Sequence, residues 1–566
     1  MSDHFPTEEK MHEFMPATEN VDVSRLQPKL DSKVEHVSFQ EQYDSTSPST
    51  LRSSASEMIV SFTPNDPDNP FNWRQRKKLV VIASGMMQIM NSTFGSSISS
   101  NATPEIAVEF QITNQECLVL PISVFLIGCI LGPLLWGPSS EYFGRRWPLL
   151  IAYCGFMIFT LACAVADSFA SLLVFRLLSG MMASAPIAIV GGLFADIQGD
   201  PTRRGRLMAY YMACAIIGPI ISPWVSGYVA PISWRWCFWI ELICSGAILP
   251  LVVFMPETYA PVILKRRAQK ARKDTGDSSI MAPLELDSRD IKQIAFVTLS
   301  RPFRMLFQEC IVSLTCLYVA LVYAIFYLYF EAYPNIFQGI YGMSAGVSGL
   351  MFLPIGLGVV LACFVFVWWD CYLARAKSRG ANWAFIEEYR RLPLACLGGP
   401  LYVISLFWVG WTSSANIHWV VPCLSGILFG TGYLLILMAM LNYLTDAYET
   451  LSASAQSATS CTRSILGAVI PLAAKPMFYR LGIPWACSLI GFLSLGVSVI
   501  PFAFIRYGDQ IRANSKFCQE LKGLKEAERL KLESEMRAGN QFDHFQKVST
   551  HTSSIVRVDV EKSGFC

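Results

Sequence analysis

Charged residues are scarce in this sequence, and the scarcity is uneven. Only 16% of the 566 residues are Asp, Glu, Lys or Arg, against about 25% in soluble proteins. Most of the charge lies in residues 1–78, 257–310 and 506–566. The intervening sequence consists of apolar runs of roughly 20 residues, the length at which a helix spans a bilayer. The composition excludes an ordinary soluble protein and predicts a membrane protein.

Signatures of catalysis and of metal binding are also missing. The sequence has no GxxxxGK[ST] loop for ATP and no CxxC pair, and its six histidines are too dispersed for a metal site or haem. The 17 cysteines lie mostly inside apolar runs, where cysteine is a small buried side chain. The net charge of +2 gives no indication of nucleic-acid binding. We therefore expect no enzyme, no cofactor and no metal.

Twelve apolar spans are expected, in two groups of six around a polar central loop, which is typical of two similar half-bundles. The predicted spans are 79–99, 117–137, 147–167, 171–194, 207–229, 237–256, 311–331, 347–369, 393–412, 418–443, 455–475 and 485–505. With the N-terminus in the cytoplasm, the short inner loops hold ten Lys or Arg and the outer loops three, as the positive-inside rule expects.

These spans divide the chain into five parts. The expected division is a disordered cytoplasmic N-terminal tail 1–78, an N-terminal six-helix bundle 79–256, a cytoplasmic central loop 257–310, a C-terminal six-helix bundle 311–506 and a cytoplasmic C-terminal tail 507–566.

The stretch GPSSEYFGRR, residues 137–146, fills the short gap between the second and third spans. Its acid lies one helical turn after the first glycine, so it could meet the positive N-terminus of a helix that approaches there. Its arginines could pair with an acid at the inner end of the fourth span. The alternative is that the arginines only anchor the loop in the cytoplasm. We expect a conformational switch formed by Gly137, Glu141, Gly144, Arg145, Arg146 and Asp196.

With this pattern the sequence resembles the major facilitator superfamily, in particular the fungal twelve-span drug:proton antiporters, a group that includes polyamine and toxin exporters. Glu141 stands where the wider family has Asp. The resemblance covers residues 66–506 and extends to DPDNPFNW (66–73), SWRWCFWI (233–240), PETYAPVILKRRAQK (256–270), YRRLPLACLGGPLY (389–402) and NYLTDAY (442–448). It implies an all-α membrane protein with twelve transmembrane helices in two pseudo-symmetric six-helix bundles, the major facilitator fold.

Two further motifs carry implications through the resemblance. RLLSG, which begins at Arg176, is similar to the family's RxxxG motif and implies a role in proton coupling; the alternative is an arginine that snorkels to the outer interface. GPIISPWVSG (218–227) is similar to the antiporter motif GPxxGPxxGG, which the family associates with export, although two serines replace glycines. The antiporter motif is matched at Gly218, Pro219, Pro223 and Gly227.

Carboxyl groups within the spans are few. Glu241 and Glu331 are the candidate proton carriers, because a carboxyl group in a low dielectric holds its proton more firmly. The alternative is that both are acids in water at the outer interface, since no carboxylate lies clearly at a span centre.

One face of the seventh span is aromatic. Facing inward, its rings would form an adaptable surface for flat organic ligands; facing lipid, they would belong to an aromatic belt. The candidate substrate cavity consists of Tyr323, Phe326, Tyr327, Phe330, Tyr433, Asn442 and Arg463. Asn101-Ala-Thr is a glycosylation sequon in the first outer loop.

These observations predict a proton-coupled exporter of small amphipathic compounds that works by alternating access. Few candidate acids stand against two buried arginines, which favours a neutral, aromatic or weakly anionic substrate over a polycation. The alternatives are a polyamine exporter, an importer or facilitator on the same fold, and a non-transporting sensor. The expected partners are a small organic substrate, protons and the lipid bilayer, without nucleic acid. We expect a monomer in the plasma membrane, with the vacuolar membrane as the alternative.

Overall fold

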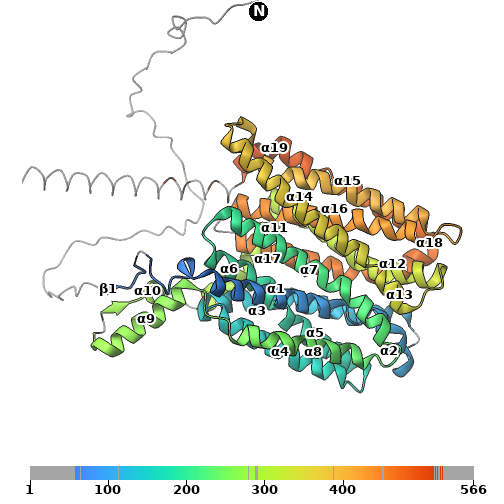
Figure 1. Cartoon of the computed structure of the whole chain (residues 1–566), viewed down its shortest axis with the longest axis horizontal. Coiled ribbons are helices and arrows are strands. Elements are labelled where there is room, and N and C mark those ends of the chain that lie inside the picture. The colour runs from blue at the N-terminus through green and yellow to red at the C-terminus, as the bar shows by residue number, and fades with distance from the viewer. Residues whose placement is uncertain are drawn as a thin grey trace, which may run out of the picture. The chain divides into compact units, whose positions relative to one another are not determined.

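Nearly all of the described chain is helical, and its long helices run side by side (Figure 1). The structure, a computed structural model, describes residues 58–515 except 64, 113, 278, 287–290, 387 and 449–451, together with 517, 519, 523 and 526. Of the tails predicted at 1–78 and 507–566, residues 1–57 and those beyond 526 lie outside this part. Ten helical segments of the described chain are long and apolar enough to cross a membrane. The prediction of an all-helical membrane fold is confirmed.

The N-terminal half has a helix at each of its six predicted spans. Its elements are η3 (Pro70–Asn72), α1 (Gln75–Ser97), η4 (Ser100–Ala102), α2 (Thr103–Glu109), η5 (Gln115–Val119), α3 (Leu120–Phe143), α4 (Arg146–Ala164), α5 (Phe169–Ala183), α6 (Ala185–Ile197), α7 (Pro201–Val229) and α8 (Arg235–Val253). The fourth span is divided into α5 and α6 at Ser184. Pro186 stands in the first turn of α6, where its missing N–H costs no helical hydrogen bond.

The C-terminal half repeats this plan. Its elements are α12 (Cys310–Tyr333), η6 (Pro334–Ile340), α13 (Ala345–Leu350), α14 (Leu353–Ser378), η7 (Asn382–Phe385), α15 (Glu388–Thr412), α16 (Val420–Tyr448), α17 (Ser452–Val469), η9 (Ile470–Ala473), α18 (Ala474–Val497) and α19 (Ile500–Asn514). The two halves contact each other where α17 packs on α3 and where α13 and α14 pack on α7.

Two predicted spans form helices that are less apolar than the ten membrane-crossing segments and are not among them: α1 and α17. Polar side chains explain the difference. Asn91 of α1 donates from Nδ2 to the Ser245 hydroxyl at 2.7 Å, inside the N-terminal half. The α17 sequence begins SASAQSATSCTRS, and the helix lies between α3 and α12. In both helices the polar groups face protein, where they can find partners that lipid does not offer.

Structure begins earlier than the boundary expected at residue 78. The strand β1 (Met58–Ile59) pairs in parallel with β2 (Ile280–Met281). Arg267 binds Asp66 through two hydrogen bonds of 2.6 and 3.1 Å, and binds Asp68 at 2.8 Å. The hydrogen bond from Arg267 lowers the pKa of Asp66 to about 2. We call β1, β2 and the Arg267–Asp66 pair the N-terminal clamp.

The central loop predicted at 257–310 is also ordered in its described part. It contains the elements α9 (Ala260–Thr275), β2, α10 (Pro283–Leu286) and α11 (Ile291–Gln308). The basic run of this loop therefore forms a helix, because α9 has apolar residues such as Val262 and Ala268 on one buried face and Lys and Arg on the others.

Candidate transport site

Arg176 is buried in the middle of the N-terminal half, with 1% of its surface exposed. Its guanidinium donates to three backbone carbonyls: Pro121 at 3.0 Å, Gly95 at 2.9 Å and Ser96 at 3.1 Å. The Phe125 ring covers it at 4.4 Å. The alternative of a snorkelling arginine does not fit this geometry, because every contact is internal and two of the acceptors belong to α1.

Glu241 of α8 is fully buried, with 0% exposure. Neither of its carboxyl oxygens has a hydrogen-bond partner in the described chain. The carboxyl group packs directly on Gly95, so closely that a Cβ at this position would overlap it. Arg176 and Glu241 thus both touch Gly95, the former at its carbonyl and the latter at its Cα. Glu241 is not an acid at the aqueous interface.

A hydrogen bond joins the two halves next to this pair. The Ser96 hydroxyl and the Tyr327 hydroxyl are 2.9 Å apart, and Tyr323 donates to Tyr327 at 3.4 Å. The carbonyl of the same serine accepts from Arg176. A continuous set of polar contacts therefore runs from the N-terminal half through α1 to α12. Sequence analysis missed Ser96, because a serine within a span carries no distinguishing signal.

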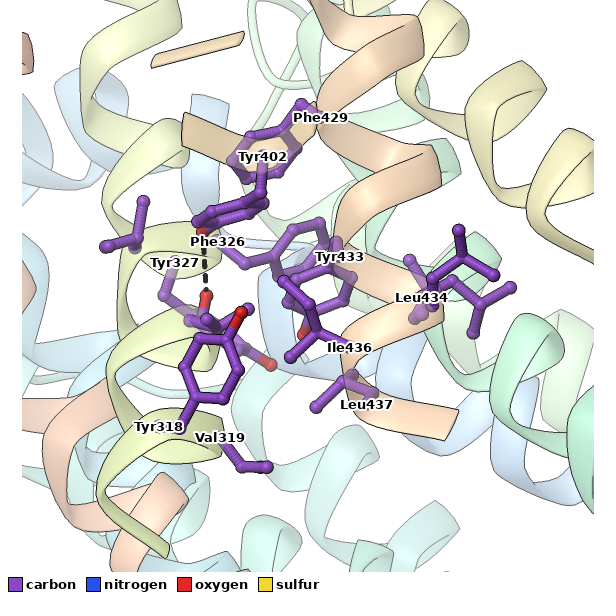
Figure 2. Close-up of a cluster of buried hydrophobic side chains, with 14 of the residues drawn as sticks. Tyr318, Val319, Phe326, Tyr327, Tyr402, Phe429, Tyr433, Leu434, Ile436 and Leu437 are labelled. Carbon is purple, nitrogen blue, oxygen red and sulfur yellow. Dashed lines mark hydrogen bonds between the residues drawn. The ribbon is translucent and has the colours of Figure 1, made fainter. Parts of the chain in front are cut away.

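The aromatic face of α12 points into the C-terminal half and not to lipid (Figure 2). Phe326 stacks on Tyr433 of α16 with ring centres 4.9 Å apart and planes at 21°. Phe330 meets Phe326 edge-on at 5.5 Å. Both Phe326 and Phe330 are at most 3% exposed. Sequence analysis missed Tyr402 and Phe429, which stack into the same cluster from α15 and α16.

The other predicted cavity residues are more scattered. Arg463 of α17 is half-buried, and its guanidinium lies 5.3 Å from the centre of the Tyr323 ring. Asn442 is half-buried on α16. Glu331 is half-buried near the end of α12, more than two turns beyond Tyr323. The structure brings Arg463 to the aromatic cluster through Tyr323, whereas Arg176 and Glu241 lie together in the other half.

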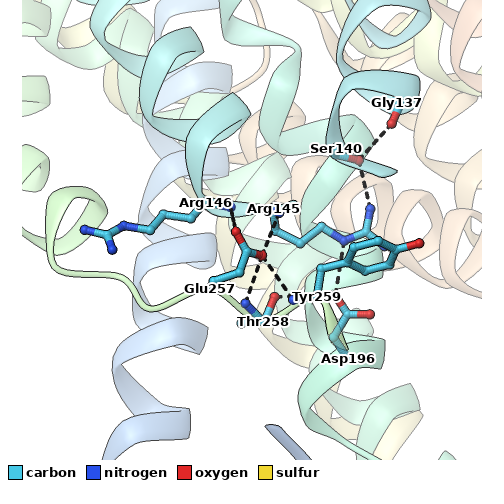
Figure 3. Close-up of polar contacts among 8 residues, drawn as sticks. All are labelled: Gly137, Ser140, Arg145, Arg146, Asp196, Glu257, Thr258 and Tyr259. Atoms are coloured by element: carbon cyan, nitrogen blue, oxygen red, sulfur yellow. Dashed lines mark hydrogen bonds and ion pairs between the residues drawn. The ribbon is translucent and has the colours of Figure 1, made fainter. Parts of the chain in front are cut away.

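The GPSSEYFGRR segment forms a polar cluster at the end of the bundle predicted to face the cytoplasm (Figure 3). Arg145 pairs with Asp196 of α6, with Nε and Oδ2 3.1 Å apart. It also donates to the Ser140 hydroxyl at 2.8 Å, and that hydroxyl donates to the Gly137 carbonyl. The Tyr259 ring covers the guanidinium at 4.6 Å, and burial there raises the pKa of the Tyr259 phenol. Of the predicted set, Arg145 and Asp196 meet directly.

Glu257, a residue that sequence analysis did not single out, closes this cluster. Its carboxylate accepts from the backbone N–H groups of Arg145 at 2.8 Å and Arg146 at 3.2 Å, at the N-terminus of α4. A carboxylate is favourable at this position because the free N–H groups there carry partial positive charge. Gly144 makes the contact possible, because it turns the chain with φ of 91° and a Cβ on it would collide with Glu257.

Two expectations for this motif need correction. Glu141 was expected to meet a helix N-terminus, but its side chain is exposed, and Glu257 takes that position. Gly137 was expected to admit a neighbouring helix, but no atom beyond its own helix lies within 4 Å of the position of a Cβ. The Glu141 side chain, one turn after Gly137, points outward. The segment that follows α8 instead runs back to the N-terminus of α4 and brings Glu257 there.

The residues of the antiporter motif on α7 make close backbone contacts with two different helices. A Cβ on Gly218 would collide with the backbone of α1, and the Pro219 carbonyl accepts from Ser97 of α1 at 3.4 Å. A Cβ on Gly227 would lie 2.7 Å from the Ala345 carbonyl carbon in the C-terminal half. The motif therefore joins α1 on one side and α13 on the other.

Asn101 does not fit the expected glycosylation. Its side chain is 8% exposed, and its Nδ2 atom donates to the Pro223 carbonyl at 2.8 Å. A glycan would have to be attached at this same nitrogen atom. The sequon thus serves to hold η4 on α7, which the three-residue pattern cannot reveal.

Two half-bundles of membrane helices that enclose a buried arginine, a buried carboxyl group and a buried aromatic cluster define a transporter of small molecules, not an enzyme. The sequence model of the Major Facilitator Superfamily matches residues 85–471, and the chain belongs to this family. The predicted likeness to fungal efflux-type transporters is confirmed by its relatives, and the chain is a multi-pass membrane protein.

Individual relatives sharpen this comparison. The Ascochitine biosynthesis cluster MFS transporter of Didymella fabae is 37% identical over 474 residues, 82% of this chain and 90% of that protein. Efflux pump FUB11 of Gibberella moniliformis is 37% identical over 469 residues, 81% of this chain and 78% of that protein. The xylose transporter XylE from E. coli, in a partially occluded inward open conformation, matches with a TM-score of 0.56 at 15% identity over 76% of this chain and 98% of that one. The likeness to XylE shows the fold alone.

Proposed function

We propose that this protein exports small amphipathic aromatic compounds in exchange for protons, as a monomer in the plasma membrane with both termini in the cytoplasm. The observation that carries the proposal is Glu241, a fully buried carboxyl group to which no residue of the described chain donates a hydrogen bond. Burying an unpaired charge costs far more than burying the neutral acid, so this position favours a group that binds a proton. The name of the relative FUB11, an efflux pump, supports the outward direction.

Arg176 would couple the proton to the conformation of α1. Both Arg176 and Glu241 contact Gly95. When Glu241 loses its proton, the new negative charge attracts the guanidinium and competes with the carbonyls of Gly95 and Ser96. A shift of Ser96 would in turn weaken its hydrogen bond to Tyr327 in the other half. Proton release and movement of the halves would thereby be linked.

The stacked rings of α12 and α16 would form the substrate surface. Phe326, Tyr433 and their neighbours are closed on one another in this conformation, so binding requires the halves to separate, as alternating access demands. Stacked rings can accept flat organic molecules of varied outline. The Arg145–Asp196–Glu257 cluster would act as the switch that holds one conformation.

The test measures accumulation of labelled aromatic toxins and spermidine in cells with and without the protein, before and after a protonophore. The expected result is lower toxin accumulation in cells with the protein, abolished by the protonophore. Raised accumulation would reverse the direction of transport. Lower spermidine without any effect on the toxins would make polyamines the substrate and contradict the proposal.

A further inference from the structure

Arg463 lies in the middle of α17, between α3 of one half and α12 of the other. Its guanidinium is 5.3 Å from the centre of the Tyr323 ring. One turn further on, a Cβ at Gly467 would come within 3.0 Å of the same ring, so the absence of a side chain lets the ring lie against α17. The arginine and the ring are thus held together by packing at the interface between the halves.

Arg463 differs from Arg176 and Arg145 because, within the described chain, its Nε atom has no hydrogen-bond partner and no acidic side chain forms an ion pair with it. Arg176 has three carbonyl acceptors, and Arg145 has an aspartate at 3.1 Å. The Nε atom of Arg463, by contrast, is buried without a hydrogen-bond partner. The titratable side chains close enough to interact with its charge include Tyr211, Tyr323, Tyr433, Cys129 and Cys461. Phenols and thiols are neutral near pH 7 in their ordinary range.

Resting on the proposed function, we propose that Arg463 binds the carboxylate of the transported compound and that the substrates are small aromatic carboxylic acids. A half-buried guanidinium without an acidic partner in the described chain lacks the negative charge that a carboxylate supplies, and the two groups match in geometry. Tyr323 lies under the guanidinium and hydrogen-bonds Tyr327. The acid's ring would then stack on the surface formed by Phe326 and Tyr433, which continues from Tyr327.

The test compares 1-naphthoate with 1-naphthamide, two probes with the same ring system of which only the first is charged at pH 7. Equilibrium dialysis of the purified full chain in detergent gives both dissociation constants without any proton gradient. Wild type should bind naphthoate roughly tenfold or more tighter than naphthamide, the size of a hydrogen bond to a charged group. R463Q should lower naphthoate affinity to the naphthamide level and leave naphthamide unchanged, and R463K should keep part of the preference.

R506Q is the matched control. Arg506 is exposed, and its guanidinium lies 5.9 Å from the Tyr507 ring, so the variant removes one arginine beside one tyrosine away from the interface. Its naphthoate preference should equal that of wild type.

Three results would overturn the inference: equal binding of both probes by wild type, equal loss of both in R463Q, or no binding of either probe. Acid-selective binding without protonophore-sensitive export would refute the proposed function and leave this assignment intact. Protonophore-sensitive export together with any of these three results would leave the proposed function intact and refute the assignment of Arg463 as the carboxylate-binding residue.

Discussion

The two halves of the molecule bury different chemistry in the same framework. The N-terminal half encloses Arg176 and Glu241, fixed by backbone carbonyls and by tight packing on Gly95. The C-terminal half encloses stacked aromatic rings, such as Phe326 on Tyr433. A directed hydrogen bond to a charged group loses energy with small displacements, whereas stacked rings tolerate sliding. The difference favours coupling in the first half and substrate binding in the second.

At the predicted cytoplasmic ends, in contrast, the halves are built alike. GRRWPL (144–149) spans the start of α4, and YRRLPL (389–394) lies in the first turns of α15. In the first half Arg145 lies 3.1 Å from Asp196, and in the second Arg391 lies 3.5 Å from Asp446. The two halves thus share the same Arg–Asp arrangement at their predicted cytoplasmic ends and differ in the side chains buried at their centres.

The largest effect is expected for Glu241→Gln, which keeps the shape of the side chain and removes its proton. Export driven by a proton gradient should fall roughly tenfold to a hundredfold, the usual range of a coupling free energy. Substrate exchange without a gradient should continue, because the aromatic half is untouched. Both are measured in proteoliposomes.

Glu331→Gln is the corresponding change in the C-terminal half. It should keep most of the proton dependence. If Glu331→Gln abolishes coupling and Glu241→Gln does not, the division of roles between the halves is reversed.

A smaller effect, on stability, is expected for Gly95→Ala, because the new Cβ would enter the space of the Glu241 carboxyl group. Overpacking of this kind costs about 1–3 kcal/mol, which should appear as a lower thermal unfolding midpoint. Gly246→Ala is the control on α8, since a Cβ there would meet no atom within 4 Å. Equal midpoints for the two variants would mean that Glu241 does not rest on Gly95.

The sequence predicted the helices better than the contacts between their side chains. The apolar runs predicted the helices, whereas the sequence leaves Arg176 open between a role in proton coupling, implied by the resemblance, and snorkelling to the outer interface. The partner of α4 could not be found in this way. Glu257 lies 112 residues after Arg145. It belongs to the motif PETYAPVILKRRAQK, but no sequence spacing links that motif to α4. The sequence spacing favoured Glu141 for this position, but Glu141 is exposed. Which acid reaches the helix N-terminus depends on the tertiary fold, which brings the segment after α8 back to α4.

The aromatic face is the opposite case. Helical spacing placed Tyr323, Tyr327 and Phe330 on one side of α12, and only tertiary packing decides that this side faces α16 and α1 rather than lipid. Ser96 and Gly95 are small residues of an ordinary span, so their roles depend entirely on what lies opposite.

A modest effect is expected from breaking the link between the halves. Ser96→Ala and Tyr327→Phe each remove one hydroxyl of the 2.9 Å hydrogen bond. Each should cost about 0.5–1.5 kcal/mol of unfolding free energy. The double variant should cost less than the sum, because the two changes remove the same bond.

Tyr329→Phe is the control on the same helix, because the buried Tyr329 hydroxyl has no hydrogen-bond partner among the residues that the structure describes. That variant should be as stable as wild type. Strict additivity of Ser96→Ala and Tyr327→Phe would mean that α1 and α12 are not joined there.

The smallest effect is expected for Asp66→Asn in the N-terminal clamp, which lies outside both buried centres. Arg267 lowers the pKa of Asp66 to about 2, below the 3.9 of a free aspartate. The pair therefore stabilises the clamp above about pH 4, and this contribution is lost as the pH falls toward 2. Pepsin should cut near β1 faster in the variant than in wild type at pH 4, and the difference should vanish at pH 2. A difference that persists at pH 2, or one that changes export, would tie the clamp to the transport site.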